Sequence, residues 1–322
     1  MSVSKITLVH KNFSTNMGNI PWIRNRLSNT FNIEPFDPDS TYDPATDIMV
    51  IDRYDDRDSG WHVPFEQQGF KLIVEYFWDT HKGQRPLIQD RVLKICAPEW
   101  IWIDDYLMSR HHGHDQRIQT GNPDKFFLLL INLIRKTRDQ LFDQVNPYLN
   151  DSLYSYRGRG IELAGDYHDH DNPEFVEQNF SNHDWYNSTN FSLVSESLPA
   201  GPESQDLYVS EKTFKPIKLN HPFIVHGSTG TLDYLHSRGF ETFGHVIDES
   251  YDLVADANER LKKIVAVLDS LYQEFTQGKR LFGDTESQMK IQHNFARFYD
   301  ESVINQLWQT QIVDVIQEFA DA

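Results

Sequence analysis

A glutamate and a lysine stand side by side at Glu211 and Lys212, within the stretch YVSEKTFKPI at residues 208–217. Ser210 before them is a typical N-cap, so the pair falls in the first turn of an expected helix. A helix N-terminus carries positive partial charge, and a lysine there is favourable when an anion binds beside it. The glutamate could accept hydrogen bonds from a ribose diol, and the lysine could reach a diphosphate. The alternative is a solvent-exposed first turn without a ligand.

A second basic group follows the apolar stretch KFFLLLI at residues 125–131. In NLIRKTR, Asn132 begins the group, and Arg135 and Arg138 are three residues apart. They would share one helix face and could together bind a phosphate. The alternative is a solubilising helix turn. Arg157 lies in RGRG, after the next expected strand, and its neighbouring glycines allow a close backbone approach to a ligand.

The elements that must position these residues alternate between strands and helices. Expected strands or apolar stretches lie at residues 5–10, 46–52, 70–77, 92–103, 125–131, 153–156, 190–195 and 222–226. Expected helices lie at residues 19–31, 104–108, 132–145, 211–219, 231–238, 252–275 and 289–319. Two βα series predict an α/β fold with two Rossmann-like, doubly wound domains facing a cleft, and long C-terminal helices. The expected domains are residues 1–123, 124–288 and a closing helix at 289–322.

Composition restricts the class of protein. The chain has 322 residues, 30 Lys and Arg against 48 Asp and Glu, and a formal net charge of −18. This acidic balance disfavours a nucleic-acid partner unless a basic groove is present locally. Cys96 is the single cysteine, so no intramolecular disulfide can form. The sequence shows neither a signal peptide nor an apolar run long enough to span a membrane, which predicts a cytoplasmic protein.

Three stretches carry a resemblance to a known family. FSLVSES at residues 191–197, the YVSEKTFKPI stretch and HPFIVHG at 221–227 resemble the donor-binding region of fucosyltransferase-like glycosyltransferases of the GT-B architecture. GFETF at 239–243 and IDESYD at 247–252 also resemble uncharacterised phage and marine viral proteins, which would place the chain in a host cytoplasm. The resemblance covers about residues 126–260.

The resemblance implies a role for each matching residue. Glu211 would bind the nucleotide ribose and Lys212 the diphosphate, Glu196 would help to shape the pocket, and Arg135 or Arg138 would add positive charge. Ser210 stands where the family commonly has threonine, which preserves the helix cap. The implied architecture places the donor in the C-terminal domain.

The resulting hypothesis is a glycosyltransferase that moves a sugar from a nucleoside diphosphate sugar to a carbohydrate or other acceptor hydroxyl, with no metal or other cofactor. Glu75 and Asp79, at the end of the strand expected at 70–77, are the candidate general bases. An Asp-X-Asp metal site at 166–171 and a histidine cluster at 110–115 are the less favoured alternatives. Two other functions stay open: glycosylation of a hydroxymethylpyrimidine base in phage DNA, and non-catalytic binding of a nucleotide or sugar.

Overall fold

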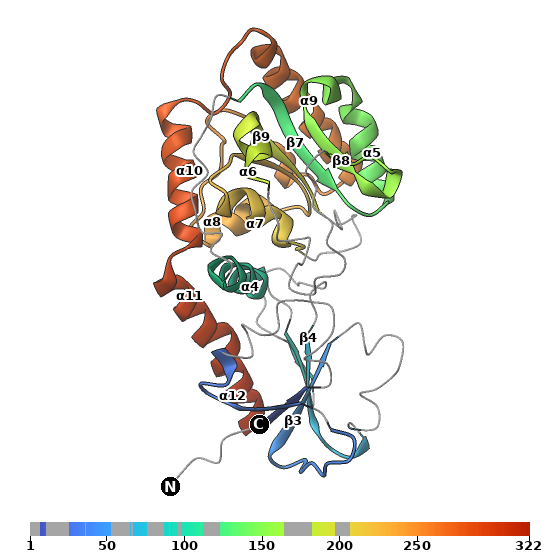
Figure 1. Ribbon diagram of the computed structural model, residues 1–322, viewed down its shortest axis with the longest axis vertical. Coiled ribbons are helices and arrows are strands. Elements are labelled where there is room, and N and C mark those ends of the chain that lie inside the picture. The colour runs from blue at the N-terminus through green and yellow to red at the C-terminus, as the bar shows by residue number, and fades with distance from the viewer. Residues whose placement is uncertain are drawn as a thin grey trace. The chain divides into compact units, whose positions relative to one another are not determined.

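The computed structural model describes residues 7–10, 26–35, 37–52, 65, 67–75, 87–89, 91–95, 98–111, 123–163, 182–196 and 207–322. The chain divides into two compact units. The first unit comprises Met1–His112, His170–Val176 and Glu301–Ala322, and the second comprises Gly113–Asp169 and Glu177–Asp300. Each unit contains its own sheet and flanking helices (Figure 1).

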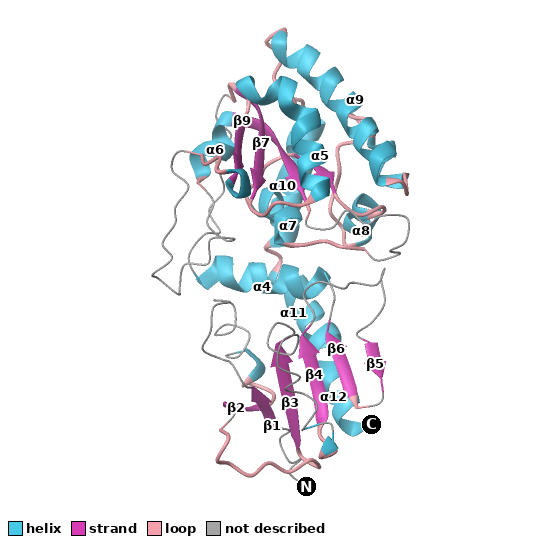
Figure 2. Cartoon of the chain, turned by 90° about the vertical axis from the view of Figure 1, so that its right-hand side faces the viewer, coloured by secondary structure: helices cyan, strands magenta, loops and turns pink. Residues whose placement is uncertain are grey.

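The described strands of the first unit form one six-stranded sheet in the order β2-β1-β3-β4-β6-β5. Their bounds are β1 Thr7–His10, β2 Asn32–Pro35, β3 Asp47–Asp52, β4 Lys71–Glu75, β5 Leu87–Gln89 and β6 Val92–Ile95. The strand pairs are parallel except for β5 and β6, which lie antiparallel at one edge (Figure 2). Val9, Met49, Phe70 and Leu72 are buried together in its core.

The apolar stretch at residues 92–103 is not one strand. It forms β6 and then α4, Pro98–His111, which begins earlier than the short helix expected at 104–108. Proline suits the first turn of a helix because its missing N–H would have no intrahelical acceptor there. Trp102, Ile103 and Tyr106 are buried, with the spacing of one helix face.

The long helix expected at residues 289–319 is also divided. It is replaced by α10 Thr285–Phe298, α11 Glu301–Trp308, a π-helical turn at Gln309–Val313 and α12 Asp314–Asp321. Tyr299 has left the helical conformation and closes α10. The segment from Glu301 onwards belongs to the first unit, where Lys71 Nζ on β4 donates to Ala320 O at 2.6 Å.

The second unit has a four-stranded, fully parallel sheet in the order β10-β9-β7-β8. The strands are β7 Lys125–Ile131, β8 Leu153–Tyr156, β9 Thr189–Ser195 and β10 Phe223–His226. The flanking α-helices are α5 Lys136–Val145, α6 His183–Ser188, α7 Glu211–Lys218, α8 Thr231–Ser237, α9 Ala257–Thr276 and α10. The predicted α/β class, with two sheet-based units and long C-terminal helices, is confirmed.

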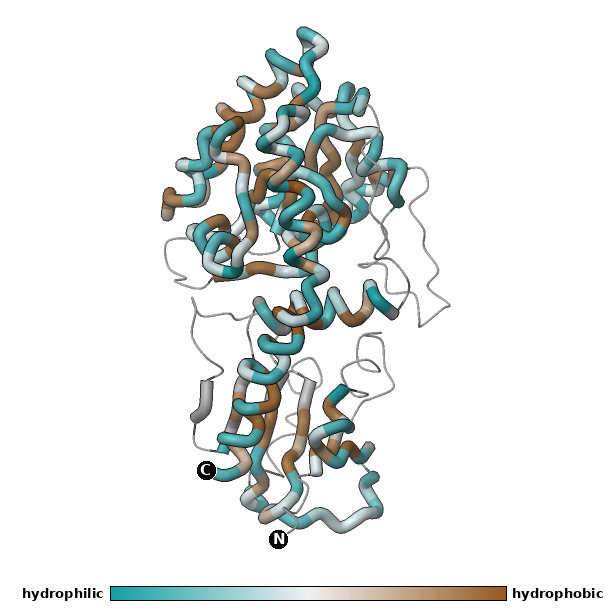
Figure 3. The backbone as a smooth tube through the Cα atoms, turned by 90° about the vertical axis from the view of Figure 1, so that its left-hand side faces the viewer, coloured by the Kyte–Doolittle hydropathy of each residue, from teal (hydrophilic) through white to brown (hydrophobic). Residues whose placement is uncertain are grey.

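An aromatic cluster fixes α9 against this sheet. The ring of Phe126, on β7, lies 5.1–5.7 Å from the rings of Tyr148, Phe191, Tyr272 and Phe275. These are the edge-to-face and tilted arrangements that aromatic rings favour. Hydrophobic residues are concentrated in the strands and on the inward helix faces (Figure 3). The sheet is therefore a rigid base for the loops that leave its carboxyl edge.

Candidate functional site

The basic and acidic residues singled out in the second half of the sequence meet at one edge of the second unit's sheet. Because β7, β8, β9 and β10 run parallel, the residues after them lie at the same carboxyl edge. Asn132 follows β7, Arg157 follows β8 and Glu196 follows β9. This edge is where ligands bind in open α/β sheets. The parallel sheet therefore places the starts of these loops at the same edge.

Glu196 is a structural carboxylate at the centre of the edge, with 0% of its surface exposed. Its Oε1 accepts hydrogen bonds from Ser210 N at 2.9 Å and Thr213 Oγ1 at 2.6 Å, and its Oε2 accepts from Ser210 Oγ at 2.6 Å. Its own N–H donates to His226 O at 3.0 Å. A buried carboxylate with these donors fixes the start of α7 relative to β9 and β10. Glu196 thereby fixes the position of the first turn of α7, which carries Glu211 and Lys212.

The first turn of α7 forms as the sequence predicts. Ser210 is the N-cap, and its side chain accepts a hydrogen bond from Lys212 N at 3.3 Å. Thr213 N donates to Ser210 O at 3.1 Å. Glu211 and Lys212 are consequently held at the positive end of the helix, beside the Glu196 network.

Glu211 and Lys212 pair with each other in this structure. Lys212 Nζ binds Glu211 Oε1 and lies 3.3 Å from Ser210 Oγ. Burial acts to raise the pKa of Glu211, but Lys212, its own N–H group and Lys215 outweigh it, so the pKa is lowered. The two side chains remain 21% and 27% exposed. An incoming anion could therefore reach Lys212, but it would compete with the Glu211 carboxylate.

Arg138 is buried, at 2% exposure, rather than presented with Arg135 on a shared outer face. Its Nη1 donates to Leu133 O at 3.2 Å. Burial and the charge of Arg135 lower its pKa, whereas Glu196 and two tyrosines oppose that shift. The predicted shared helix face of Arg135 and Arg138 is therefore wrong, because α5 begins only at Lys136 and Arg138 is buried. Arg138 holds the loop after β7 through its hydrogen bond to Leu133 O, and adds buried positive charge next to that loop.

Arg135 and the neighbouring Lys136 are the accessible cations of this loop, and Arg135 is the one that is partly buried. It is the N-cap of α5 and is partly exposed, since the helix begins at Lys136 and not at residue 132. Within the described part of the chain its guanidinium has no hydrogen-bond or ion-pair partner, and its Nε is buried. A partly buried cation that lacks a counter-ion and lies near the second cation, Arg138, is stabilised when an anion binds.

The loop after β8 has a mainly structural role. Arg159 forms ion pairs with Asp139 and with Asp143, the latter at 3.0 Å, and lies over the ring of Tyr156. Gly158 N donates to Asn132 O at 2.7 Å, and a Cβ on this glycine would lie 2.8–3.0 Å from the loop after β7. The sequence predicted that the backbone at these glycines would come close to a ligand; in the structure Gly158 instead comes close to the loop after β7. Arg157, partly exposed, is the remaining candidate there.

Asp252 is a site-edge residue that sequence reasoning missed. Its two carboxylate oxygens accept from Thr231 N at 3.1 Å and Leu232 N at 3.0 Å. Burial raises its pKa to about 6, against these N–H groups and Arg260. The start of α8 is thereby occupied by a carboxylate of the protein itself. No local sequence pattern predicts this contact, because Asp252 lies 21 and 20 residues after Thr231 and Leu232, whose N–H groups it accepts.

Several candidates lie outside the described residues. These are Asp79, the Asp-X-Asp stretch at 166–171 and most of the histidine cluster at 110–115. Glu75 is the last residue of β4 in the first unit, where only its backbone is described. Among the described residues no group of three or more His, Cys, Asp or Glu could hold a metal ion. No described helix is long and apolar enough to cross a membrane.

Comparisons with known proteins give one structural likeness. No protein-family model and no curated protein sequence matches the chain. A crystal structure of an α1,3-fucosyltransferase with GDP-fucose is similar over 94% of this chain and 92% of that one. The sequence identity is 11% and the TM-score is 0.41. At that level the assignment of an activity depends on the residues of the site.

Proposed function

We propose that the protein is a glycosyltransferase that moves a sugar from a nucleoside diphosphate sugar to an acceptor hydroxyl. The observation that supports this most directly is the partly exposed guanidinium of Arg135, which has no counter-ion among the described residues. It lies at the sheet edge where α7 begins, with Lys212 in the first turn of that helix. A diphosphate provides the compensating negative charge. The resemblance of the three stretches between residues 191 and 227 to the donor region of fucosyltransferase-like enzymes supports the same proposal.

In the proposed complex, Arg135 and Lys212 bind the diphosphate and Glu211 accepts hydrogen bonds from the ribose hydroxyls. The Glu211–Lys212 pair opens as the diphosphate takes the place of the glutamate at the lysine. Arg138 and Glu196 act as positioning residues, because both are buried and both fix elements that carry the ligand-binding groups. Asn132, which is exposed, and Arg157 are further contacts at the rim.

The reaction breaks the bond between the anomeric carbon and the diphosphate oxygen, and forms a bond from that carbon to the acceptor oxygen. Negative charge develops on the leaving diphosphate, where fixed cations stabilise the transition state. Arg135 and Lys212 would supply this charge without a metal. The acceptor proton passes to a carboxylate, for which Glu75 and Asp79 remain the proposed candidates.

Calorimetry with matched variants tests the donor site. Arg135→Ala and Lys212→Ala should each weaken binding of a nucleoside diphosphate at least about 10-fold, or ~1.4 kcal/mol, because each removes a charge-assisted contact to phosphate. Affinity for the uncharged nucleoside should change by less than about twofold. Arg159→Ala is the matched control, since Asp139 and Asp143 already engage that cation at the same edge.

Equal losses for the diphosphate and the nucleoside would contradict a phosphate role for these side chains. Transfer is then measured with a panel of UDP- and GDP-sugars and simple saccharide acceptors. Tight binding of the donors without transfer or hydrolysis of any of them would favour a non-catalytic nucleotide-binding protein instead.

A further inference from the structure

The segment that leads into α7, residues 207–210, is held by side chains from two neighbouring loops. Its four residues are at most 4% exposed, but the segment belongs to neither sheet. Ser210 N donates to Glu196 Oε1, after β9, at 2.9 Å. Tyr208 N donates to Ser228 Oγ, after β10, at 3.0 Å. Two side chains thus accept from alternate N–H groups, as a neighbouring strand would, and the second contact fixes the segment relative to β10.

Ser228 belongs to the short loop between β10 and α8 and is 1% exposed. Its carbonyl oxygen accepts from Thr231 Oγ1 at 2.7 Å and from Thr231 N at 3.3 Å. The loop is therefore closed on itself before α8 begins. The position of the Ser228 hydroxyl, and with it the contact to Tyr208, depends on the conformation of residues 228–231.

Asp252 fixes that conformation, because three consecutive N–H groups donate to it. Gly230 N donates to its carbonyl oxygen at 3.0 Å. Thr231 N donates to Oδ1 at 3.1 Å, and Leu232 N donates to Oδ2 at 3.0 Å. Asp252 is only 5% exposed, and N–H groups in such a place are left unsatisfied when their acceptor is removed. The loop of Ser228 thus depends on a residue of the 3₁₀ turn that precedes α9.

Arg260, in the first turns of α9, holds the same loop and is 1% exposed. Its Nη1 donates to Thr229 Oγ1 at 2.7 Å and to Val254 O, and Thr229 Oγ1 donates to Val254 O at 3.1 Å. The charges of Arg260 and Asp252 attract each other. The loop after β10 cannot shift without breaking charge-assisted hydrogen bonds from both residues.

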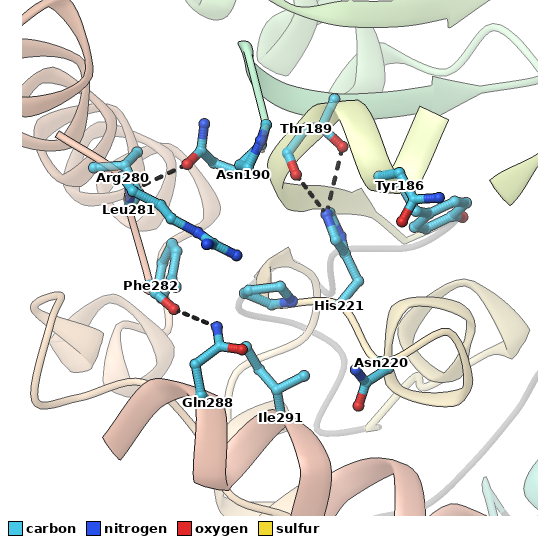
Figure 4. Close-up of a pocket in the computed structure, with 13 residues that line it drawn as sticks. Tyr186, Thr189, Asn190, Asn220, His221, Arg280, Leu281, Phe282, Gln288 and Ile291 are labelled. Carbon is cyan, nitrogen blue, oxygen red and sulfur yellow. Dashed lines mark hydrogen bonds between the residues drawn. The ribbon is translucent and has the colours of Figure 1, made fainter. Parts of the chain in front are cut away.

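The two strands that carry these loops are fixed to each other at their amino ends. His221, just before β10, places Nε2 at 3.0 Å from Thr189 O at the start of β9 (Figure 4). The parallel pairing of β9 and β10 carries this spacing to the carboxyl edge. The strands therefore do not compensate for a movement of the loop after β10, and such a movement changes the position of Ser228 relative to Glu196.

We propose that Asp252 and Ser228 are positioning residues of the donor site. Asp252 fixes the loop after β10, and the Ser228 hydroxyl in that loop fixes Tyr208. The first turn of α7, with Glu211 and Lys212, follows directly. Neither positioning residue contacts the ligand. The inference rests on the proposed function only for the identity of the ligand that this turn binds.

Calorimetry with Ser228→Ala, Asp252→Asn and the double variant tests the proposal, with UDP, GDP and their nucleosides as probes. Each single variant should weaken the diphosphate and its nucleoside alike, by about fivefold, because the whole turn is displaced; Lys212→Ala should weaken mainly the diphosphate. The double variant should bind within about twofold of the weaker single variant, since both changes act through one hydrogen bond. Asp248→Asn is the matched control, because its exposed carboxylate accepts from Ser250 N in the same 3₁₀ turn.

Hydrogen exchange separates positioning from a general loss of stability. The amides of Tyr208 and Lys212 should exchange faster in Ser228→Ala and in Asp252→Asn, by a larger factor than the amides of β9. An equal factor in β9, parent rates at Tyr208 and Lys212 in Asp252→Asn, or additive losses of affinity in the double variant would overturn the proposal. A parent chain that binds no nucleoside diphosphate would contradict the proposed function, and the exchange rates would still decide whether Asp252 and Ser228 position α7.

Discussion

Mild acid should destabilise the second unit through two buried histidines. His221 and His226 are almost completely buried, and burial lowers the pKa of each from 6.5 to about 4. For His226 the charge of Arg260 acts in the same direction. His221 is suited to the neutral form, because Nε2 lies 3.0 Å from Thr189 O and Nδ1 lies 3.0 Å from Ser192 Oγ.

The direction of this change in stability with pH depends on whether the folded or the unfolded state binds protons first as the pH falls. As the pH falls, the unfolded chain binds a proton at each histidine near pH 6.5, while the folded protein resists protonation until about pH 4. The stabilisation is therefore complete above the unfolded pKa and is lost as the pH falls from 6.5 to 4. Between pH 7.5 and 5 the loss is about 2 kcal/mol per histidine, at ~1.4 kcal/mol per pKa unit.

Asp252 acts in the opposite direction. Its folded pKa is raised from 3.8 to about 6, so the folded state binds a proton first and gains stability as the pH falls. Between pH 7.5 and 5 this gain is about 1 kcal/mol by the same linkage relation. The three groups together should leave a net loss of about 2–3 kcal/mol in the free energy of unfolding of the second unit.

The loss is measured by urea unfolding at pH 7.5 and at pH 5. Hydrogen exchange at the amides of β9 and β10 monitors the unfolding of the second unit. His221→Gln should show a smaller pH-dependent loss than the parent chain, by about 2 kcal/mol. Asp252→Asn should show a larger one, because the opposing gain is removed. His293→Gln, at an exposed histidine on α10, is the matched control and should behave as the parent.

The comparison is decisive because each variant is judged by its change with pH and not by its stability at one pH. A His221→Gln protein that loses as much stability as the parent between the two pH values would refute the buried, neutral histidine. A loss in Asp252→Asn equal to that of the parent would show that the carboxyl group capping α8 is ionised throughout this range.

Two predictions concern the chemistry of the proposed reaction. Glu75→Gln and Asp79→Asn should each keep nucleoside diphosphate affinity within about twofold, or ~0.4 kcal/mol, and at least one should abolish transfer, because the base acts on the acceptor and not on the donor. Normal transfer by both variants would place the base elsewhere. Transfer should also survive excess EDTA, since arginine and lysine stabilise the leaving group; complete loss that manganese or magnesium restores would favour the Asp-X-Asp stretch at 166–171.

The repeating order of strands and helices was readable from the sequence because it depends on local patterns. Each strand of the second unit combines a short apolar run with a polar or glycine-containing loop, and all four expected positions agree closely with the structure. Parallel pairing then brings the following loops to one edge. The first turn of α7 was predictable for the same reason, since Ser210 forms its cap through neighbouring residues.

The burial of individual side chains within the site could not be predicted from local sequence patterns. Arg135 and Arg138 have equivalent chemistry and helical spacing, but the helix begins only at Lys136, so one is the cap residue and the other turns into the interior. The contact of Gly158 with the loop after β7 depends on the distance between two strands. The split of the expected C-terminal helix likewise depends on packing in both units, which a continuous helical period does not reveal.

The adjacency of Glu211 and Lys212 can be understood from the charge balance around it. In a chain with a net charge of −18, a lone lysine at a helix N-terminus would attract other carboxylates of the protein. The neighbouring glutamate provides a counter-ion that is tethered by one peptide unit and suits the helix dipole. The α8 N-terminus shows the contrasting solution, since Asp252 occupies it from a distant segment and is buried there. Only the pair on α7 stays partly exposed, and this makes α7 the one of these two helix starts that an external anion can reach.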